Sequence, residues 1–183
     1  MIDIHSHIIS GIDDGSKNTE MTIKMLEMAE ESGTTDIVAT PHFMRGRFEV
    51  TYKEVIDEVE NLKKLTKENS ININIYSGQE VYYSRNILEY YNQGMIGTIN
   101  NTRYMLIEFP MLEFNTEEAI NTLYELQIRG IVPIIAHPER YKQFIKNPSQ
   151  INLLIKEGML FQVNAGSING DFGRDVKKTA IKY

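Results

Sequence analysis

Short apolar segments alternate along the chain with longer segments in which apolar residues recur every three or four positions. The short segments predict strands at about residues 1–7, 36–40, 71–75, 104–107, 131–135 and 160–163. The longer ones predict helices at about 18–32, 51–65, 85–91, 116–130, 148–158 and 171–183. Six strand–helix units in series predict a parallel sheet with right-handed crossovers, as a barrel or an open doubly wound sheet.

Helix boundaries are marked by capping residues and glycines. Thr51 and Glu54 have the spacing of a capping box and predict the start of the second helix. Thr116, followed by acidic residues, predicts the N-cap of the helix that ends at Gly130. Gly33 is expected to end the first helix.

Composition narrows the classes of function. A chain of 183 residues with 42% hydrophobic and 24% charged residues predicts one globular domain, residues 1–183. The net charge of −6 argues against a nucleic-acid partner. There are no cysteines, which excludes disulfides, thiolate ligands and a cysteine nucleophile. No signal peptide or apolar membrane span is recognisable, so a cytoplasmic location is expected.

Histidine and carboxylate residues follow the predicted strands at their C-terminal ends. They are His5 and His7, then His42, Glu80, Glu108 and His137. The ends of parallel strands meet at one edge, where α/β proteins build their sites. These groups suit Zn²⁺, Mn²⁺ or Fe²⁺, and their number predicts a multinuclear centre for phosphoester hydrolysis.

Each of these residues also has a simpler explanation when taken alone. A single histidine after a strand is typical of a hydrogen-bonded structural residue, and Asp13-Asp14-Gly15 is typical of a turn. Arg140 could hold a substrate phosphate or form an ion pair with Glu139. The recurrence of metal-ligand types at one edge is what favours a metal site.

The loop after His42 contains candidate substrate contacts. Arg45 and Arg47 could overhang the site or carry solvated charge. Three aromatic residues of the same segment could line a slot for an aromatic substrate: Phe43, Phe48 and Tyr52. For Tyr52, packing in the core or against a helix is the favoured role.

The chain resembles the polymerase and histidinol phosphatase (PHP) superfamily. Within it, the closest resemblance is to the bacterial metal-dependent protein-tyrosine phosphatases of capsular and extracellular polysaccharide synthesis. The motifs that carry this resemblance span almost the whole chain in the family's order: Met1-Ile-Asp-Ile-His-Ser-His7, Gly11-Ile-Asp-Asp-Gly15, Ala39-Thr-Pro-His42, Gly78-Gln-Glu80, Leu106-Ile-Glu-Phe-Pro110 and Pro133-Ile-Ile-Ala-His-Pro-Glu-Arg140.

The resemblance implies a distorted (β/α)₇ TIM-like barrel with up to three metals, usually manganese, with iron, magnesium or zinc as alternatives. It implies that the first metal is bound by His5 and His7, the second by Glu108 and His137 with Glu80 bridging the two, and the third by Asp14 and His42. It also implies that Arg140 contacts the substrate phosphate, and that a metal-activated hydroxide attacks phosphotyrosine.

The implied substrate is the tyrosine-rich tail of a membrane-associated tyrosine autokinase. A small-molecule phosphoesterase of the same superfamily is the alternative enzyme, and a non-catalytic metal-binding remnant is the alternative without turnover. The resemblance leaves the oligomeric state open between a monomer and a homo-oligomer.

The family pattern continues with a Ser-Asp-Ala-His type motif and a later arginine that this sequence does not contain. The resemblance therefore implies a barrel without its last strand–helix segment. The expectation is a complete second metal site and weakened first and third sites.

Overall fold

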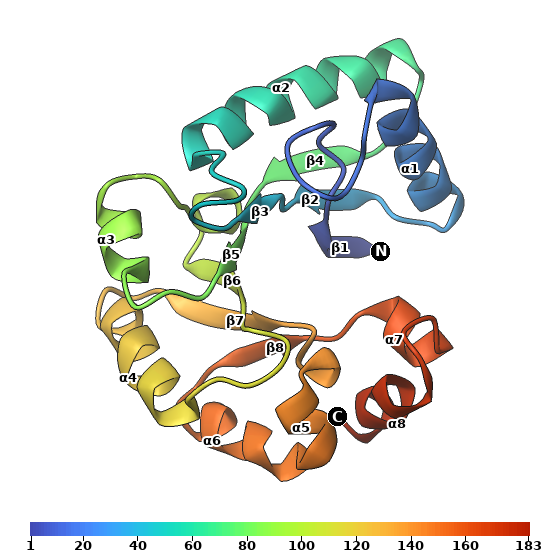
Figure 1. Ribbon diagram of the computed structural model, residues 1–183. Coiled ribbons are helices and arrows are strands. Elements are labelled where there is room, and N and C mark those ends of the chain that lie inside the picture. Colours follow the sequence, from blue (N-terminus) through green and yellow to red (C-terminus); the bar gives the residue numbers. More distant parts are fainter. The chain divides into compact units, whose positions relative to one another are not determined.

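The expected alternation of strands and helices is present in the computed structural model, which describes all residues from 1 to 183 (Figure 1). The strands are β1 Ile2–Ser6, β2 Asp36–Ala39, β3 His42–Phe43, β4 Asn74–Ser77, β5 Glu80–Tyr82, β6 Tyr104–Glu108, β7 Val132–Ala136 and β8 Leu160–Gln162. The helices are α1 Thr19–Glu31, α2 Tyr52–Glu68, α3 Ile87–Asn92, α4 Thr116–Gln127, α5 Lys142–Lys146, α6 Ile151–Lys156, α7 Ala165–Asn169 and α8 Arg174–Lys182. Short 3₁₀ turns occupy Ile99–Asn101, Pro138–Arg140 and Pro148–Gln150.

The chain forms two units, of which the first comprises Met1–Val81 and Glu89–Met105. Strands β1, β2 and β4 form a parallel sheet in that order, and helices α1 and α2 lie over one face of it (Figure 1). The core between them is aliphatic and includes Leu26, Ile37, Val55, Val59, Leu62 and Ile75. This packing explains the three-to-four-residue apolar spacing of the two helices.

Helices α1 and α2 begin where the sequence predicts. The Asn18 side chain accepts a hydrogen bond from the Met21 N–H at the start of α1. At the start of α2, Thr51 and Glu54 make both hydrogen bonds of a capping box. These bonds satisfy amide groups that the helix itself leaves without partners, and so stabilise the helix start by about 1 kcal/mol.

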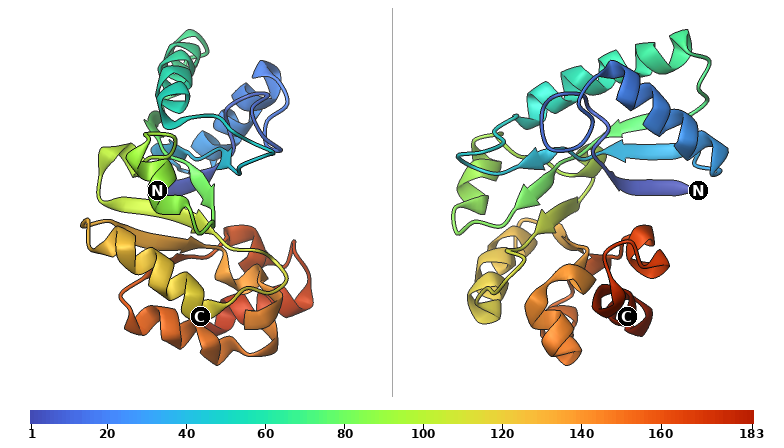
Figure 2. Two further views of the ribbon diagram at one scale, coloured as in Figure 1. Left: turned by 60° about the vertical axis from the view of Figure 1, so that its left-hand side comes forward. Right: turned by 45° about the vertical axis from the view of Figure 1, so that its right-hand side comes forward.

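The second unit comprises Tyr82–Leu88 and Leu106–Tyr183. Strands β6, β7 and β8 follow one another in its sheet, and β7 pairs with β8 in parallel. Helices α7 and α8 lie side by side near the C-terminus (Figure 2). The core contains an aromatic cluster in which the ring pairs make stacked and edge contacts; its members are Phe109, Phe114, Tyr141 and Phe144.

Several predicted boundaries are wrong. The segment 71–75 alternates buried and exposed side chains as expected, but its strand begins only at Asn74. The N-cap of α4 is Asn115 and not Thr116, since the Asn115 side chain accepts the Glu118 N–H. The last helix begins at Arg174, because Gly173, with φ +96°, separates it from α7. Strands β3 and β5 and helices α5 and α7 were not predicted.

The structure confirms an α/β fold with parallel strands. The strands pair within a three-stranded sheet and a five-stranded sheet, and the expected TIM-like barrel is not confirmed. None of the helices is long and apolar enough to cross a membrane.

Candidate metal centre

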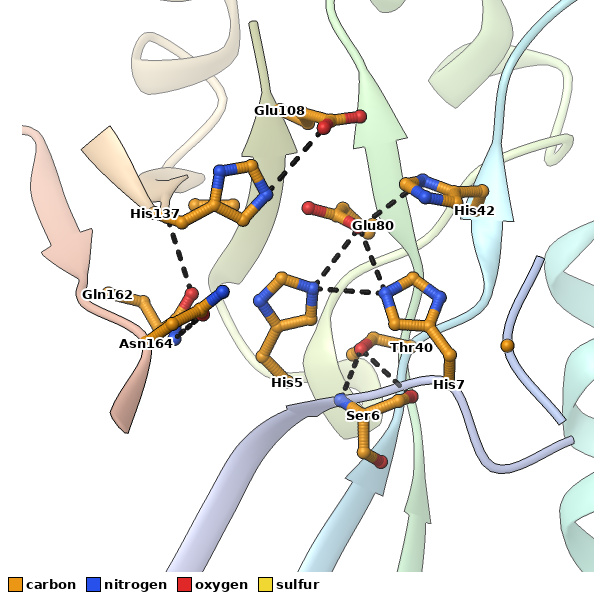
Figure 3. Close-up of polar contacts among 12 residues, drawn as sticks. His5, Ser6, His7, Thr40, His42, Glu80, Glu108, His137, Gln162 and Asn164 are labelled. Carbon is orange, nitrogen blue, oxygen red and sulfur yellow. Dashed lines mark hydrogen bonds and ion pairs between the residues drawn. The ribbon is translucent and has the colours of Figure 1, made fainter. Parts of the chain in front are cut away.

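His5 in strand β1 and His7 directly after the strand direct their side chains to one side. Alternate residues of a strand share a face, and Ser6 between them faces the neighbouring strand β2. The Ser6 N–H donates to Thr40 Oγ1 at 2.9 Å (Figure 3). The Ser6 hydroxyl donates to the Val38 carbonyl at 2.7 Å. Ser6 therefore anchors the backbone between the two histidines.

Three imidazoles converge on one carboxylate oxygen. Glu80 Oε2 lies 3.1 Å from the Nε2 atoms of His5 and His7 and 3.2 Å from Nδ1 of His42 (Figure 3). Strand pairing creates part of this arrangement, since His42 of β3 is the register partner of Glu80 in β5. Glu80 is 1% exposed, so its charge lies in a site largely shielded from water.

Asp13 orients His7 through Nδ1, the ring nitrogen that does not face Glu80. Its Oδ2 accepts the Nδ1–H of His7 at 2.7 Å and the backbone N–H of His42 at 3.0 Å. Its Oδ1 accepts the Gly15 N–H at 2.8 Å. A carboxylate on the far nitrogen of a histidine is the usual way of fixing a metal ligand's tautomer and ring orientation. The sequence interpretation noted Asp13 only as part of a turn.

The ionisation of the cluster follows from its contacts. Burial lowers the pKa of His7, but hydrogen bonds and charges from Asp13 and Glu80 outweigh it and raise that pKa to about 10. Burial raises the pKa of Asp13, but its hydrogen bond with His7 and that residue's charge lower it overall. Burial and the charge of His7 lower the pKa of His42, against the opposing acidic groups. His42 is therefore neutral at pH 7, the state that a metal ligand needs.

Asp14 stands at the exposed side of this cluster. Its Oδ1 lies 3.5 Å from His42 Nε2, and its side chain is about half exposed. Asp14, His7 and His42 can each offer one ligand atom within 4.8 Å of the others. The sequence prediction of Asp14 and His42 as neighbours is consistent with this placement.

The second unit brings together Glu108 and His137, which the resemblance assigns to the second metal. Glu108 ends β6 and His137 follows β7, with Glu108 Oε1 3.6 Å from His137 Nε2. His137 has a left-handed backbone, φ 31° and ψ 57°, and its N–H donates to Gln162 Oε1 at 3.4 Å (Figure 3). Such a conformation is strained for a residue with a Cβ and clusters at functional sites.

Arg140 does not form an ion pair with the neighbouring Glu139. Its guanidinium lies 4.5 Å from the centre of the Phe172 ring. Glu139 is fully buried and accepts hydrogen bonds from Ser167 Oγ at 2.6 Å and Asn164 N–H at 3.0 Å. The alternative of an Arg140–Glu139 ion pair is therefore wrong.

The two arginines of the loop after β3 differ. Arg45 forms an ion pair with Glu49 at 2.7 Å. Arg47 lies over the Phe48 ring at 4.8 Å, and Phe48 stacks on His42 with ring centres 5.7 Å apart. Phe48 is thus the aromatic residue next to the histidine cluster.

The other two aromatic residues proposed for a substrate slot belong to the core. Phe43 is 1% exposed and Tyr52 is 8% exposed. This agrees with the packing role favoured for Tyr52, and it leaves Phe48 as the only one of the three beside the cluster.

The donor atoms fit a divalent metal. The Nε2 atoms of His5 and His7 are 3.2 Å apart, and both are 3.1 Å from Glu80 Oε2. A tetrahedral ion with bonds of about 2.0–2.2 Å separates its ligand atoms by about 3.3–3.6 Å. Small side-chain movements would therefore let this group hold an ion, and the nitrogen and oxygen donors suit Zn²⁺, Mn²⁺ or Fe²⁺.

Comparison with known proteins agrees with this interpretation of the site. The family model for capsular polysaccharide synthesis, CpsB/CapC, matches residues 1–182. The chain belongs to the CpsB/CapC family. It is 39% identical to CapC of Staphylococcus aureus over 100% of this chain and 71% of that protein. It is 36% identical to the tyrosine-protein phosphatase CpsB of Streptococcus pneumoniae over 90% of this chain and 68% of that protein.

A solved structure gives the same fold for this CpsB/CapC chain. It is described among the crystal structures of YwqE from Bacillus subtilis and CpsB from Streptococcus pneumoniae, "unique metal-dependent tyrosine phosphatases". The match has a TM-score of 0.94 and 32% identity, and covers 100% of this chain and 73% of the other. The chain therefore has the α/β fold of a solved member of this family.

Proposed function

We propose that the chain is a metal-dependent protein-tyrosine phosphatase. The observation that carries this proposal is the convergence of His5, His7 and His42 on Glu80 Oε2, at 3.1, 3.1 and 3.2 Å, in a member of the CpsB/CapC family. Three imidazoles and a shared carboxylate are a donor set that suits a metal ion. They do not form a nucleophile–base pair, and there is no cysteine to act as a thiol nucleophile.

Three groups of residues would hold the metals. One consists of His5, His7 and Glu80, and a second contains Asp14 and His42. Glu108 and His137 in the second unit form the third group. A divalent metal in such a site acts as a Lewis acid toward the phosphoryl group and lowers the pKa of water. Asp13 holds the proton on Nδ1 of His7 and so leaves Nε2 as the ligand atom.

The substrate phosphate is assigned to Arg140. A guanidinium can bind two phosphate oxygens at once, and Glu139 does not compete for it. Stacking on Phe172 restricts the orientation of the guanidinium. Arg47 is proposed as a further substrate contact because it packs on Phe48, which in turn stacks on His42. Arg45 is instead paired with Glu49.

We propose manganese as the metal, with iron, magnesium and zinc as the ions to compare. We propose as substrate the phosphorylated tyrosine-rich tail of a tyrosine autokinase of polysaccharide synthesis, in line with the family's role in capsule synthesis. The cytoplasmic location, the single domain over residues 1–183 and the PHP-type barrel stay predictions of the sequence.

The test is hydrolysis of p-nitrophenyl phosphate and a phosphotyrosine peptide with added Mn²⁺, compared with histidinol phosphate. Activity on the first two that is lost with a chelator is expected. His42→Ala and Arg140→Ala should each lower kcat/KM at least a hundredfold. Arg129→Ala is the matched control, because Arg129 is exposed and contacts only its own helix turn at Glu125. Preference for histidinol phosphate, or equal loss in all three variants, would contradict the proposal.

A further inference from the structure

The buried hydroxyl of Tyr141 connects the ends of two strands in the second unit. Tyr141 is fully buried, and its Oη donates to the Ala136 carbonyl at 2.7 Å. The same oxygen accepts the Phe109 N–H at 3.0 Å. Ala136 is the last residue of β7, and Phe109 follows the last residue of β6. One side-chain atom therefore bridges two neighbouring strand ends.

Each of the two backbone groups that the Tyr141 hydroxyl contacts lies in a peptide unit formed by a proposed metal ligand and its neighbour in the chain. The Phe109 N–H lies in the peptide unit that joins Glu108 to Phe109, and the Ala136 carbonyl lies in the unit that joins Ala136 to His137. A peptide unit is planar, so fixing one of its atoms restricts the backbone of both residues that it joins. The hydroxyl thus acts on the two residues whose side chains lie 3.6 Å apart, Glu108 and His137.

The Tyr141 ring is itself held on several sides. It makes edge contacts with Phe109, Phe114 and Phe144, with ring centres 5.8–6.2 Å apart, and with the His137 imidazole at 5.7 Å. A ring packed in this way has little rotamer freedom, so its hydroxyl has a defined position. The left-handed backbone of His137 turns the chain back after β7, and the chain then reaches Tyr141 four residues later.

We infer that Tyr141 is a positioning residue for the metal pair Glu108 and His137. The inference rests on the proposed metal-dependent function, and it assigns to the hydroxyl the task of holding both ligand backbones in register before an ion binds. Replacing Tyr141 by Phe keeps the ring and its packing but removes the bridge. The two ligands can then shift independently, and tenths of an ångström matter for metal affinity.

The test is a Mn²⁺ titration of the full chain, measured by isothermal titration calorimetry, for the wild type, Tyr141→Phe and a control. Tyr52→Phe is the matched control, because Tyr52 is also buried and its hydroxyl accepts the Asn101 N–H at 3.2 Å. Tyr141→Phe should weaken binding of at least one Mn²⁺ by about 10–100-fold. Tyr52→Phe should change every Mn²⁺ affinity by less than threefold, although both variants melt at a lower temperature.

A double-mutant cycle separates positioning from a general loss of stability. In a Glu108→Gln background, where the pair is already disrupted, Tyr141→Phe should have less than a threefold further effect on Mn²⁺ affinity. An undiminished effect would overturn the inference, as would wild-type affinity in Tyr141→Phe. A wild-type chain that binds no Mn²⁺ would refute the proposed function itself, and with it the positioning role.

Hydrogen exchange on the unmodified protein keeps the inference testable if Tyr141→Phe does not fold. Coupling is reciprocal: if the bridge favours metal binding, the metal must favour the bridge. The Phe109 amide, which donates to Tyr141, should exchange at least tenfold more slowly with Mn²⁺ than with chelator. Equal exchange rates with and without Mn²⁺ would refute the coupling.

Discussion

Metal binding to the histidine cluster should expel a proton from His7. In the metal-free protein burial lowers the pKa of His7, but Asp13 and Glu80 raise it to about 10. A metal ligand must be neutral, so the proton on Nε2 has to leave when an ion binds. At pH 7, removal of a proton from a group with a pKa of about 10 costs about 4 kcal/mol, at 1.36 kcal/mol per unit. The metal must supply this free energy.

The consequence is a Kd that depends on pH. Because one proton competes with the ion, the Kd for Mn²⁺ should fall about tenfold for each pH unit between 6.5 and 8.5. Calorimetry at pH 7 in buffers of different ionisation enthalpy counts the released protons directly. Asp13→Asn is the diagnostic variant, because it removes one of the two charges that raise the pKa of His7.

Asp13→Asn should therefore release fewer protons and have a shallower pH dependence than the wild type. Its affinity at high pH, where His7 is neutral in both proteins, should be about 10–100-fold weaker because the ring loses its orienting carboxylate. A Kd that does not change with pH in the wild type would refute this reasoning. The same proton count in both proteins would show that Asp13 does not control the charge of His7.

Three further predictions follow from the same contacts. In chelator, the contribution of His7 to stability should be complete below pH 6.5 and should be lost as the pH rises toward 10, because the protonated His7 stabilises the fold only while it keeps its proton; urea unfolding between pH 6.5 and 10 measures this. Gly15→Ala should destabilise by about 1–3 kcal/mol and weaken Mn²⁺ binding, since a Cβ there would collide with the backbone and Cβ of His7; thermal melts with and without metal test both. Arg47→Ala should raise KM for an acidic phosphotyrosine peptide about 3–10-fold, roughly 1 kcal/mol, while Arg45→Ala should change it less; equal effects would exclude a specific role for the stack on Phe48.

The sequence predicted well those elements whose pattern is long enough to be periodic. Helices α1 and α2 have two or more turns of apolar spacing and recognisable caps, and both start where expected. Strands β3 and β5, of two and three residues, are too short to show any period. At α4, Asn115 and Thr116 are both good capping residues, and only the backbone geometry decides between them.

The candidate ligands were predicted because strand ends collect at one edge, but their supporting residues were not. Asp13 could have been inferred from its place in a polar turn, yet nothing local shows that it reaches His7 Nδ1 at 2.7 Å. The same is true of Tyr141, whose role depends on two strand ends distant from each other in sequence. Supporting contacts of this kind are tertiary, and a pattern along one chain does not contain them.

The strained backbone of His137 shows why the supporting residues matter. A left-handed residue with a Cβ costs about 1–3 kcal/mol and persists only where its surroundings hold it. Here the N–H of His137 donates to Gln162, and the preceding carbonyl is bound by Tyr141. Both bonds belong to the peptide unit before the strained position, and on the other side the His137 carbonyl accepts the Arg140 N–H at 3.0 Å. These bonds offset the strain before any ion binds. An ion that binds therefore has to order less of the backbone and fewer side chains, as expected for a preorganised metal site.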